Sequence, residues 1–302
     1  MKWSVLCLVV LGFSQFASAE SKFEFKEISA TGLQLSEAGK PVFVYNFGPV
    51  LQPGFPQTMA RSSYIHPLFA PDGTLLTDDF NKNHPHHRGI FWAWMDIRVG
   101  GKKADIWTLK GDFKEQFVAW KAKDVDADTA HLAIDNGWFD VDKKFVKEEV
   151  DIVTHAVKDN TRVMDFTLSF EAVDQPVQIK GTDEPPGNKW YGGFAFRFAP
   201  RDGGEAKTTL LTDQGNLAKD GVMSPHPWTE ITGMFEGKPE GGRVDDDPSN
   251  PGYPKNGWLL RHGFGLLNVS YPGPNAVTLE AGKPLVLKYK VTLYSGSAVP
   301  KN

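Results

Sequence analysis

Apolar and polar residues alternate with a period of two along several stretches of the chain. In segment 285–293 one set of alternate positions is apolar, namely Leu285, Leu287, Tyr289, Val291 and Leu293, and between them lie Lys288, Lys290 and Thr292. Segment 162–170 repeats this pattern, with Met164, Phe166, Leu168 and Phe170 set against Asp165, Thr167 and Ser169. A period of two predicts half-buried β-strands. Further strands are expected over 42–45, 90–97, 117–121, 131–134, 145–153, 191–198, 208–211, 264–270 and 277–279.

No stretch of 12 or more residues shows the 3.6-residue spacing of an amphipathic helix. Strands that follow one another without helices between them predict an all-β fold. Their number is too large for one small sandwich, so we expect a large antiparallel β-sandwich of two packed sheets. The sequence has no repeat of fixed period, which disfavours a propeller. Three long irregular stretches, 52–89, 181–189 and 215–256, interrupt the strands, and long loops in a compact domain are often functional.

The N-terminus has the pattern of a secretory signal peptide. A short basic region at Lys2 precedes an apolar run over 5–13, and Ala17-Ser18-Ala19 is a typical cleavage pattern. We therefore expect residues 1–19 to be removed, residues 20–302 to form a single β-domain, and the protein to be periplasmic or secreted. The single cysteine, Cys7, would leave with the signal, so no disulfide or thiol chemistry is expected in the mature chain.

Composition narrows the possible partners. The chain has 33 Lys and Arg against 37 Asp and Glu, a formal net charge of −4, and no run of basic residues. This balance argues against a nucleic-acid partner. After residue 19 no apolar run reaches the ~18 residues of a membrane span, so none is expected in the mature chain. The sequence gives no indication of oligomeric state.

Four of the eight histidines, His66, His84, His86 and His87, fall within 22 positions, and Arg88 follows directly. Imidazole suits proton transfer near neutral pH and also ligates metals, so these four are the candidate catalytic residues. Their spacing matches no specific metal motif, although a divalent metal at the cluster stays open. If the strand at 90–97 already includes position 86, alternation places His86 on the face of Arg88, Trp92 and Trp94. His87 would then share the opposite face with Phe91, Met95 and Ile97.

Other segments supply candidate substrate-binding residues. In segment 190–198, Phe194, Phe196 and Phe198 form one face, and the opposite face has small residues between Tyr191 and Arg197. Asp105 and Trp107, if on a strand, face the same way and would pair a carboxylate with an indole for a sugar. The complete set of candidates for substrate binding is Arg88, Trp94, Asp105, Trp107, Tyr191, Arg197, Asn250, Arg261 and His262.

Acidic residues provide weaker signals. The run Asp245-Asp246-Asp247 lacks the spacing of a calcium loop and is typical of a solvated turn. A general base is also conceivable among the carboxylates in or near strands, provided that it is buried beside the histidines. These carboxylates are Asp105, Asp165, Glu148, Glu149, Glu171 and Glu280.

Several motifs together resemble a known family. They are Tyr64-Ile65-His66-Pro67, Pro71-Asp72-Gly73, His84-Pro85-His86-His87-Arg88-Gly89, Asp105-Ile106-Trp107, Tyr191-Gly192-Gly193, Pro248-Ser249-Asn250-Pro251 and the segment 258–261. From about residue 40 to 296 the chain resembles the secreted bacterial family labelled methane oxygenase PmoA-like. The resemblance implies a galactose-mutarotase-like β-supersandwich, an association with polysaccharide-degrading bacteria, and a sugar on the concave face of one sheet. It further implies acid/base histidines and hydroxyl-binding arginines at His66, His84, His86, His87, Arg88, Arg197 and Arg261.

These observations predict an exported carbohydrate-active enzyme, a lyase, hydrolase or epimerase, that uses His-assisted acid/base chemistry. His86 or His66 would be the acid/base, and Trp94 or Trp107 the platform for a sugar ring. Arg88, Arg197 and Arg261 would clamp hydroxyl or carboxylate groups. Two alternatives remain open: a non-catalytic glycan-binding protein, which needs aromatic and Arg side chains but no converging histidines, and a copper or other metal-dependent oxidase.

Overall fold

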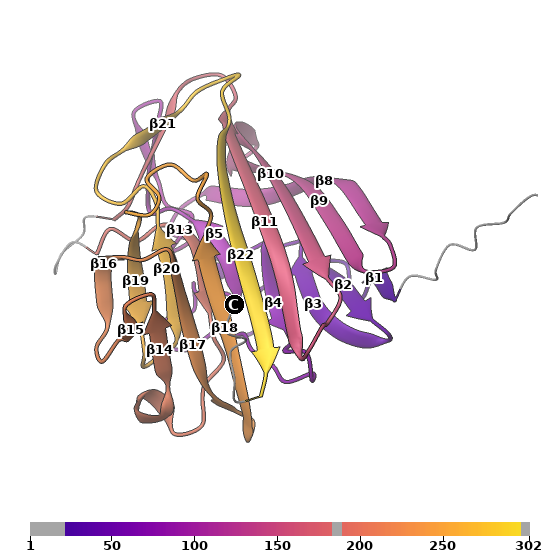
Figure 1. Ribbon diagram of the computed structural model, residues 1–302. Coiled ribbons are helices and arrows are strands. Elements are labelled where there is room, and N and C mark those ends of the chain that lie inside the picture. The colour runs from indigo at the N-terminus through magenta and orange to yellow at the C-terminus, as the bar shows by residue number, and fades with distance from the viewer. Residues whose placement is uncertain (1–21, 183–188, 297–302) are drawn as a thin grey trace, which may run out of the picture.

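The computed structural model describes residues 22–182 and 189–296, and the expected signal peptide lies outside these ranges. The chain forms three antiparallel sheets, two of nine strands and one of four (Figure 1). The first sheet has the spatial order β1 (Phe23–Glu27), β2 (Gly32–Glu37), β3 (Lys40–Asn46), β4 (Tyr64–Leu68), β5 (Ile90–Ala93), β13 (Gly193–Arg197), β20 (Leu266–Ser270), β19 (Gly257–Arg261) and β16 (Gly221–Pro225).

The second sheet has the order β15 (Gly215–Asn216), β14 (Thr209–Thr212), β17 (Trp228–Phe235), β18 (Lys238–Asp246), β22 (Leu285–Ser295), β11 (Thr161–Ala172), β10 (Lys143–His155), β9 (Thr129–Asp140) and β8 (Phe113–Val125). The small sheet has the order β21 (Val277–Leu279), β12 (Val177–Lys180), β6 (Asp96–Val99) and β7 (Lys102–Ala104). Two 3₁₀ turns, η1 (Gln57–Met59) and η2 (Gly204–Lys207), are the helical elements of the described residues. No helix in these ranges is long and apolar enough to cross a membrane.

The core lies between the two large sheets. Trp94, directly after β5, packs against Trp138 of β9 with ring centroids 5.4 Å apart, and Phe194 of β13 packs against Phe166 of β11 at 5.2 Å. All four side chains are at most 1% exposed. The period-two alternation of segments 162–170 and 285–293 therefore buries one face of β11 and β22, as expected from the sequence. The all-β fold and the large antiparallel sandwich are confirmed.

A carboxylate anchors the core between the sheets. Glu148 of β10 is fully buried. It accepts hydrogen bonds from the indole N–H groups of Trp92 at 2.9 Å and Trp138 at 2.6 Å, and from the amide of Asn136 at 3.0 Å. These three donors replace the hydration that the carboxylate loses, which is the usual condition for a buried charge.

Three expectations about secondary structure are wrong. Segment 52–89 is not one irregular stretch, because it contains β4. Segment 215–256 is not one irregular stretch, because it contains β15 to β18. Its Gly-rich composition hides these strands: a Cβ atom on Gly241 would collide with the ring of Tyr294, so a packed strand needs glycine there. Segment 90–97 is not one strand either, because the chain leaves the first sheet after Ala93 and enters the small sheet at Asp96.

Candidate functional site

Three histidine rings meet in the loop before β5. The centroids of His86 and His87 are 4.4 Å apart, those of His84 and His87 5.0 Å, and those of His84 and His86 5.9 Å. We call these three residues the His cluster. The expectation that His86 and His87 point to opposite faces is wrong, because β5 begins only at Ile90. The amides of His84 and His87 instead bond back three residues, to Asn81 and His84, so two successive turns bring the rings together.

Gly89 fixes the point where this loop joins the sheet. Its φ is +52°, and a Cβ atom there would collide with the carbonyl oxygen of Ile65 in β4. Its amide donates to the carbonyl of Asp78 at 2.8 Å, and its own carbonyl accepts from the amide of Arg197 at 2.7 Å. The glycine that ends the histidine motif therefore allows the loop to lie directly against β4 and β13.

Aromatic and cationic side chains surround the His cluster. Phe264, in the turn after β19, lies 4.6 Å from the ring of His84, and the guanidinium of Arg197 lies 4.8 Å from the same phenyl ring. Below the cluster, the ring of His87 lies 5.7 Å from Trp107. The ring of Trp107 in turn lies 5.0 Å from Tyr191. His84, His86, Phe264 and Tyr191 are half-buried, so solvent reaches part of each of these side chains.

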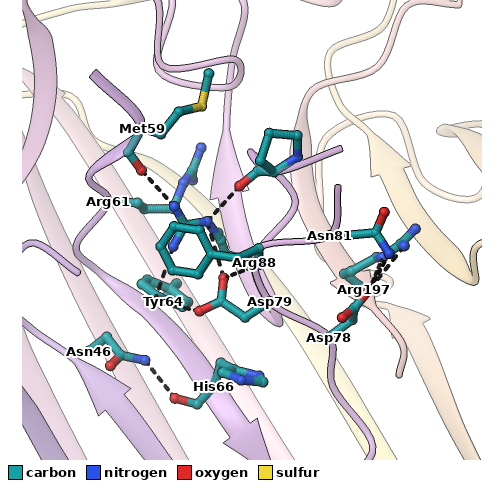
Figure 2. Close-up of polar contacts among 12 residues, drawn as sticks. Asn46, Met59, Arg61, Tyr64, His66, Asp78, Asp79, Asn81, Arg88 and Arg197 are labelled. Atoms are coloured by element: carbon teal, nitrogen blue, oxygen red, sulfur yellow. Dashed lines mark hydrogen bonds and ion pairs between the residues drawn. The ribbon is translucent and has the colours of Figure 1, made fainter. Parts of the chain in front are cut away.

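Two consecutive carboxylates hold two arginines beside the cluster (Figure 2). The Nη2 atom of Arg197 lies 3.1 Å from Asp78, and the Nε atom of Arg88 lies 3.1 Å from Asp79. His66 of β4 lies beside this pair, and its Nδ1 atom is 2.9 Å from the hydroxyl of Thr77. Asp78 and Asp79 were not among the sequence candidates. Their position directly before the histidine motif is the only sequence signal that points to them.

Arg88 is committed to the scaffold. Its side chain is fully buried and lies 3.4 Å from the ring centroid of Phe80. It donates to the carbonyl oxygen of Pro85 at 2.7 Å and to that of Met59 at 2.6 Å (Figure 2). Since its N–H groups are engaged inside the protein, Arg88 shapes the histidine loop and does not face a ligand. Arg197 differs, because its Nη1 atom has no hydrogen-bond partner within the described residues.

Burial keeps the histidines neutral. Loss of hydration, together with the nearby charges of Arg61 and Lys110, lowers the pKa of His86 to about 3. Desolvation also lowers the pKa of His84, and the charge of Arg197 is the next largest cause. For His87 the pKa is lowered first by desolvation and then by the neighbouring His86. Desolvation also lowers the pKa of His66. The cluster therefore offers uncharged imidazoles, which are weak bases while their pKa stays low and which carry no extra proton to donate.

Arg61 is a further residue that the sequence analysis missed. It is buried, its guanidinium lies 4.8 Å from the ring centroid of Phe91, and it donates to the carbonyl oxygens of Ile106 at 2.7 Å and Trp107 at 2.9 Å. It thereby joins the loop before β4 to the wall of the His cluster. An arginine isolated in a long loop has no neighbouring motif that would have identified it.

Several sequence candidates lie away from the cluster or in structural roles. Trp94 is fully buried in the core between the sheets and donates to the carbonyl of Tyr271, so it has no surface to offer a sugar. The expectation that Asp105 and Trp107 lie on a strand is wrong, because both lie in a turn after β7. There the carboxylate of Asp105 accepts from the amides of Trp107 at 3.0 Å and Thr108 at 2.8 Å. Trp107 itself is buried beside His87.

The candidates from the C-terminal third also have internal partners. Asn250 bonds to Asp246 and to the backbone of Lys288 in the second sheet, away from the His cluster. His262 lies against Asp220, 3.2 Å from its carboxylate, and its Nε2 atom is 2.6 Å from the carbonyl of Leu217. Arg261 is half-buried, and its Nη1 atom lies 3.6 Å from the carboxylate of the same Asp220. Its positive charge contributes to the lowered pKa of His84.

The strand carboxylates do not provide a base beside the histidines. Glu148 lies in the core, and Asp165 and Glu149 are on the outer face of the second sheet, where they pair with His155 and Lys121. Glu171 pairs with Lys147 on the same sheet, and Glu280 pairs with Lys283. Within residues 22–182 and 189–296, no group of three or more His, Cys, Asp and Glu side chains is arranged to hold a metal ion.

Comparison with known proteins places the chain in a family. A profile described as a family of unknown function, DUF6807, matches residues 32–302. The chain belongs to this family. The match gives no evidence for the methane oxygenase PmoA-like family that the motifs resemble. No match was found among the curated proteins.

Solved structures similar to the chain include carbohydrate-active proteins. The heparan sulfate lyase HepC from Pedobacter heparinus has a TM-score of 0.41 and 7% identity, over 95% of this chain and 38% of that one. A galactose mutarotase related enzyme from Lactobacillus acidophilus has a TM-score of 0.36 and 8% sequence identity, and the match covers 92% of this chain and 99% of that one. The GalM/aldose epimerase homologue from C. elegans has a TM-score of 0.38 and 8% sequence identity, and the match covers 92% of this chain and 100% of that one. The chain spans well under half of the lyase. With TM-scores below 0.5, none of these similarities bears on activity.

Proposed function

We propose that the protein is an exported carbohydrate-active enzyme in which a neutral imidazole of the His cluster, His86 first and His84 second, acts as the general base. The observation that carries this proposal is the convergence of three imidazoles with Arg197 and Phe264, contributed by distant segments, at one half-buried place on the first sheet. The resemblance of the histidine motif to the PmoA-like family supports a sugar substrate. The signal-like sequence over 1–19 supports export.

The charges around the cluster favour an acidic sugar as substrate. Each charged side chain that shifts the pKa of His84 is a cation, namely Arg197, Lys189 or Arg261. The same holds for His86, where these cations are Arg61, Lys110 and Arg88. A carboxylate brought by the substrate would offset these charges and raise the pKa of the imidazole towards neutrality. The base would then become effective when the substrate is bound.

The reaction class that fits a neutral base is abstraction of a proton from the carbon next to the substrate carboxylate. The imidazole takes this proton, and the electron pair moves onto the carboxylate. The pair then returns either to expel the oxygen on the neighbouring carbon, which takes the proton back from the imidazolium in a lyase reaction, or to accept a proton from water on the opposite face, which is an epimerisation and leaves the imidazolium to release its proton to solvent. Hydrolysis fits less well, because it needs a strong proton donor at the leaving oxygen and lowered histidine pKa values disfavour one.

The test is turnover of acidic and neutral oligosaccharides by the wild type and by His86→Gln and His84→Gln. We expect wild-type activity on uronate-containing substrates, detected by the ultraviolet absorbance of an unsaturated product or by NMR of an epimer. Loss of the base lowers activity about 10²–10⁴-fold. His131→Gln, on the second sheet, removes an imidazole outside the cluster and is the matched control. Binding of acidic sugars without any wild-type turnover would instead identify a glycan-binding protein.

A further inference from the structure

The outer face of the second sheet carries two adjoining cavities. One has a volume of about 840 Å³ and is lined by His155, Asp165 and Lys290, among others. The other has a volume of about 380 Å³ and is lined by Trp228, Tyr253 and again Lys290. Because both cavities contact Lys290 of β22, they adjoin along that strand. We call the two together the outer groove.

The floor of the outer groove is a row of four residues in direct register. Asp165 of β11 lies opposite Lys290 of β22, Lys290 lies opposite Asp245 of β18, and Asp245 lies opposite Trp228 of β17. Neighbouring strands are about 4.8 Å apart, so the row extends for about 14 Å across the sheet. Figure 1 shows these four strands, β11, β22, β18 and β17, side by side. This direction suits a short linear chain lying across the strands.

The row faces away from the core. Phe166, Val291 and Val244, which alternate with the residues of the row, are at most 1% exposed. In contrast, the side chain of Asp165 is 45% exposed and that of Asp245 is 24% exposed. The outer groove therefore lies on the opposite face of the sandwich from the His cluster, which lies on the outer side of the first sheet.

One end of the outer groove is aromatic. Trp228 and Tyr253 are both half-buried and line the smaller cavity. The guanidinium of Arg243 lies 4.2 Å from the ring centroid of Trp228, and its Nε atom donates to both oxygens of Asp245 at 3.0 Å. This fork holds Arg243 against the indole. Rings with an apolar face and a polar edge are suited to the apolar faces of sugar rings.

The outer groove carries charges of both signs, and carboxylates outnumber cations in its smaller cavity, where Asp245, Asp246 and Asp247 lie with Arg243 and Lys290. In the larger cavity three cations, Lys22, Lys158 and Lys290, lie among three carboxylates, Asp128, Asp159 and Asp165. Lys290 is exposed and lies opposite Asp165 and Asp245, so a ligand on this face can reach its ammonium group. Alternating donors and acceptors match hydroxyl groups, which can both donate and accept. A highly charged ligand would meet repulsion from one half of these groups.

We propose that the outer groove binds a neutral oligosaccharide chain, laid across β11, β22, β18 and β17 with one sugar ring against Trp228 and Tyr253. This site differs from the His cluster in its position, in its aromatic end and in the charge of its ligand. It would hold a polysaccharide independently of the reaction at the cluster.

The experiment is affinity electrophoresis of the full-length protein in native gels that contain soluble polysaccharides. The neutral probes are galactomannan, xyloglucan, β-glucan and starch, and polygalacturonate is the acidic one. We expect at least one neutral polysaccharide to retard the wild type. We expect Trp228→Ala and Tyr253→Ala each to weaken the interaction about tenfold, which corresponds to about 1.4 kcal/mol. Thr167→Ala, on the same face of β11 but outside both cavities, should bind as the wild type does.

Two further variants keep the result interpretable. Asp165→Asn, at the far end of the row, is expected to weaken binding even if Trp228→Ala is too unstable to purify. His86→Gln should be retarded as strongly as the wild type, because the His cluster lies on the other face. This separates failure of the groove from failure of the proposed enzyme. Absence of retardation in every neutral gel, or retardation that Tyr253→Ala and Asp165→Asn leave unchanged, would overturn the proposal.

Discussion

The ring of His84 lies against the ring of Phe264, with centroids 4.6 Å apart and planes 28° from parallel. These residues are 180 positions apart in the sequence, and Phe264 also lies 4.8 Å from the guanidinium of Arg197. One phenyl ring thus contacts a half-buried imidazole and a buried cation, which are brought to it by different segments. The position of His84 depends on this contact as well as on its own loop.

We expect Phe264→Leu to lower turnover of an acidic oligosaccharide about tenfold and to change the melting temperature little. Leucine keeps the apolar volume, while the aromatic contact, worth about 0.5–1.5 kcal/mol, is lost and the imidazole is less well held. The control is Phe117→Leu, a half-buried aromatic residue of β8 that packs against Phe47 and Trp120. Equal turnover in Phe264→Leu and the wild type would show that Phe264 does not position the site.

The lowered pKa of His86 predicts a pH dependence of stability. In the unfolded chain a histidine has a pKa near 6.5, against about 3 for His86 in the folded protein. Between these values the unfolded state binds more protons, so the stabilisation present above pH 6.5 is lost as the pH falls towards 3. We expect wild type to lose more stability than His86→Gln between pH 7 and pH 4.5, by a difference of the order of 1 kcal/mol.

Urea unfolding of both proteins at the two pH values measures this difference. His131→Gln again serves as the control, since it removes an imidazole from the outer face of the second sheet, where it lies 2.9 Å from Asp151. If His86→Gln and the wild type lose stability in parallel, the imidazole of His86 is not held in its neutral form by burial.

Arg88→Lys tests whether Arg88 is a scaffold residue. Lysine has a single nitrogen, which cannot reach the carbonyls of Pro85 and Met59 and the carboxylate of Asp79 together. We expect a loss of about 3 kcal/mol in the free energy of unfolding, because buried acceptors lose their partner. Arg98→Lys, at a side chain that is 58% exposed, should change stability by less than about 0.5 kcal/mol. Thermal and urea unfolding provide the measurement.

The fold was largely predictable from local pattern, because alternation at positions such as Met164 and Phe166 follows directly from burial of one strand face. The histidine segment was also recognised from its composition. Its geometry was not, since the faces of His86 and His87 depend on where β5 begins, and that is set by the contact of Gly89 with β4. Alternation could not reveal a pair of turns ending in a glycine.

Asp78 and Phe264 were missed for a different reason. Each acquires its role only through residues far away in the sequence, Arg197 for Asp78 and His84 for Phe264. Asn250 shows the converse, because its polar motif has a purely internal role against Asp246 and Lys288. A side chain type alone does not distinguish a residue that meets a ligand from one that satisfies buried backbone groups.

A substitution at Glu148 tests whether its buried carboxylate stabilises the core between the two large sheets. Its two oxygens accept three hydrogen bonds, from the indoles of Trp92 and Trp138 and from the amide of Asn136. In Glu148→Gln one carboxylate oxygen is replaced by an NH₂ group, which faces an N–H donor, so a buried donor loses its acceptor. The remaining hydrogen bonds then have a neutral amide oxygen as acceptor in place of a carboxylate oxygen. We expect a loss of about 3 kcal/mol in the free energy of unfolding, measured in urea. Glu149→Gln, the next residue and 48% exposed, should change it by less than about 0.5 kcal/mol. Similar values for the two variants would mean that the carboxylate of Glu148 does not anchor the two sheets to each other.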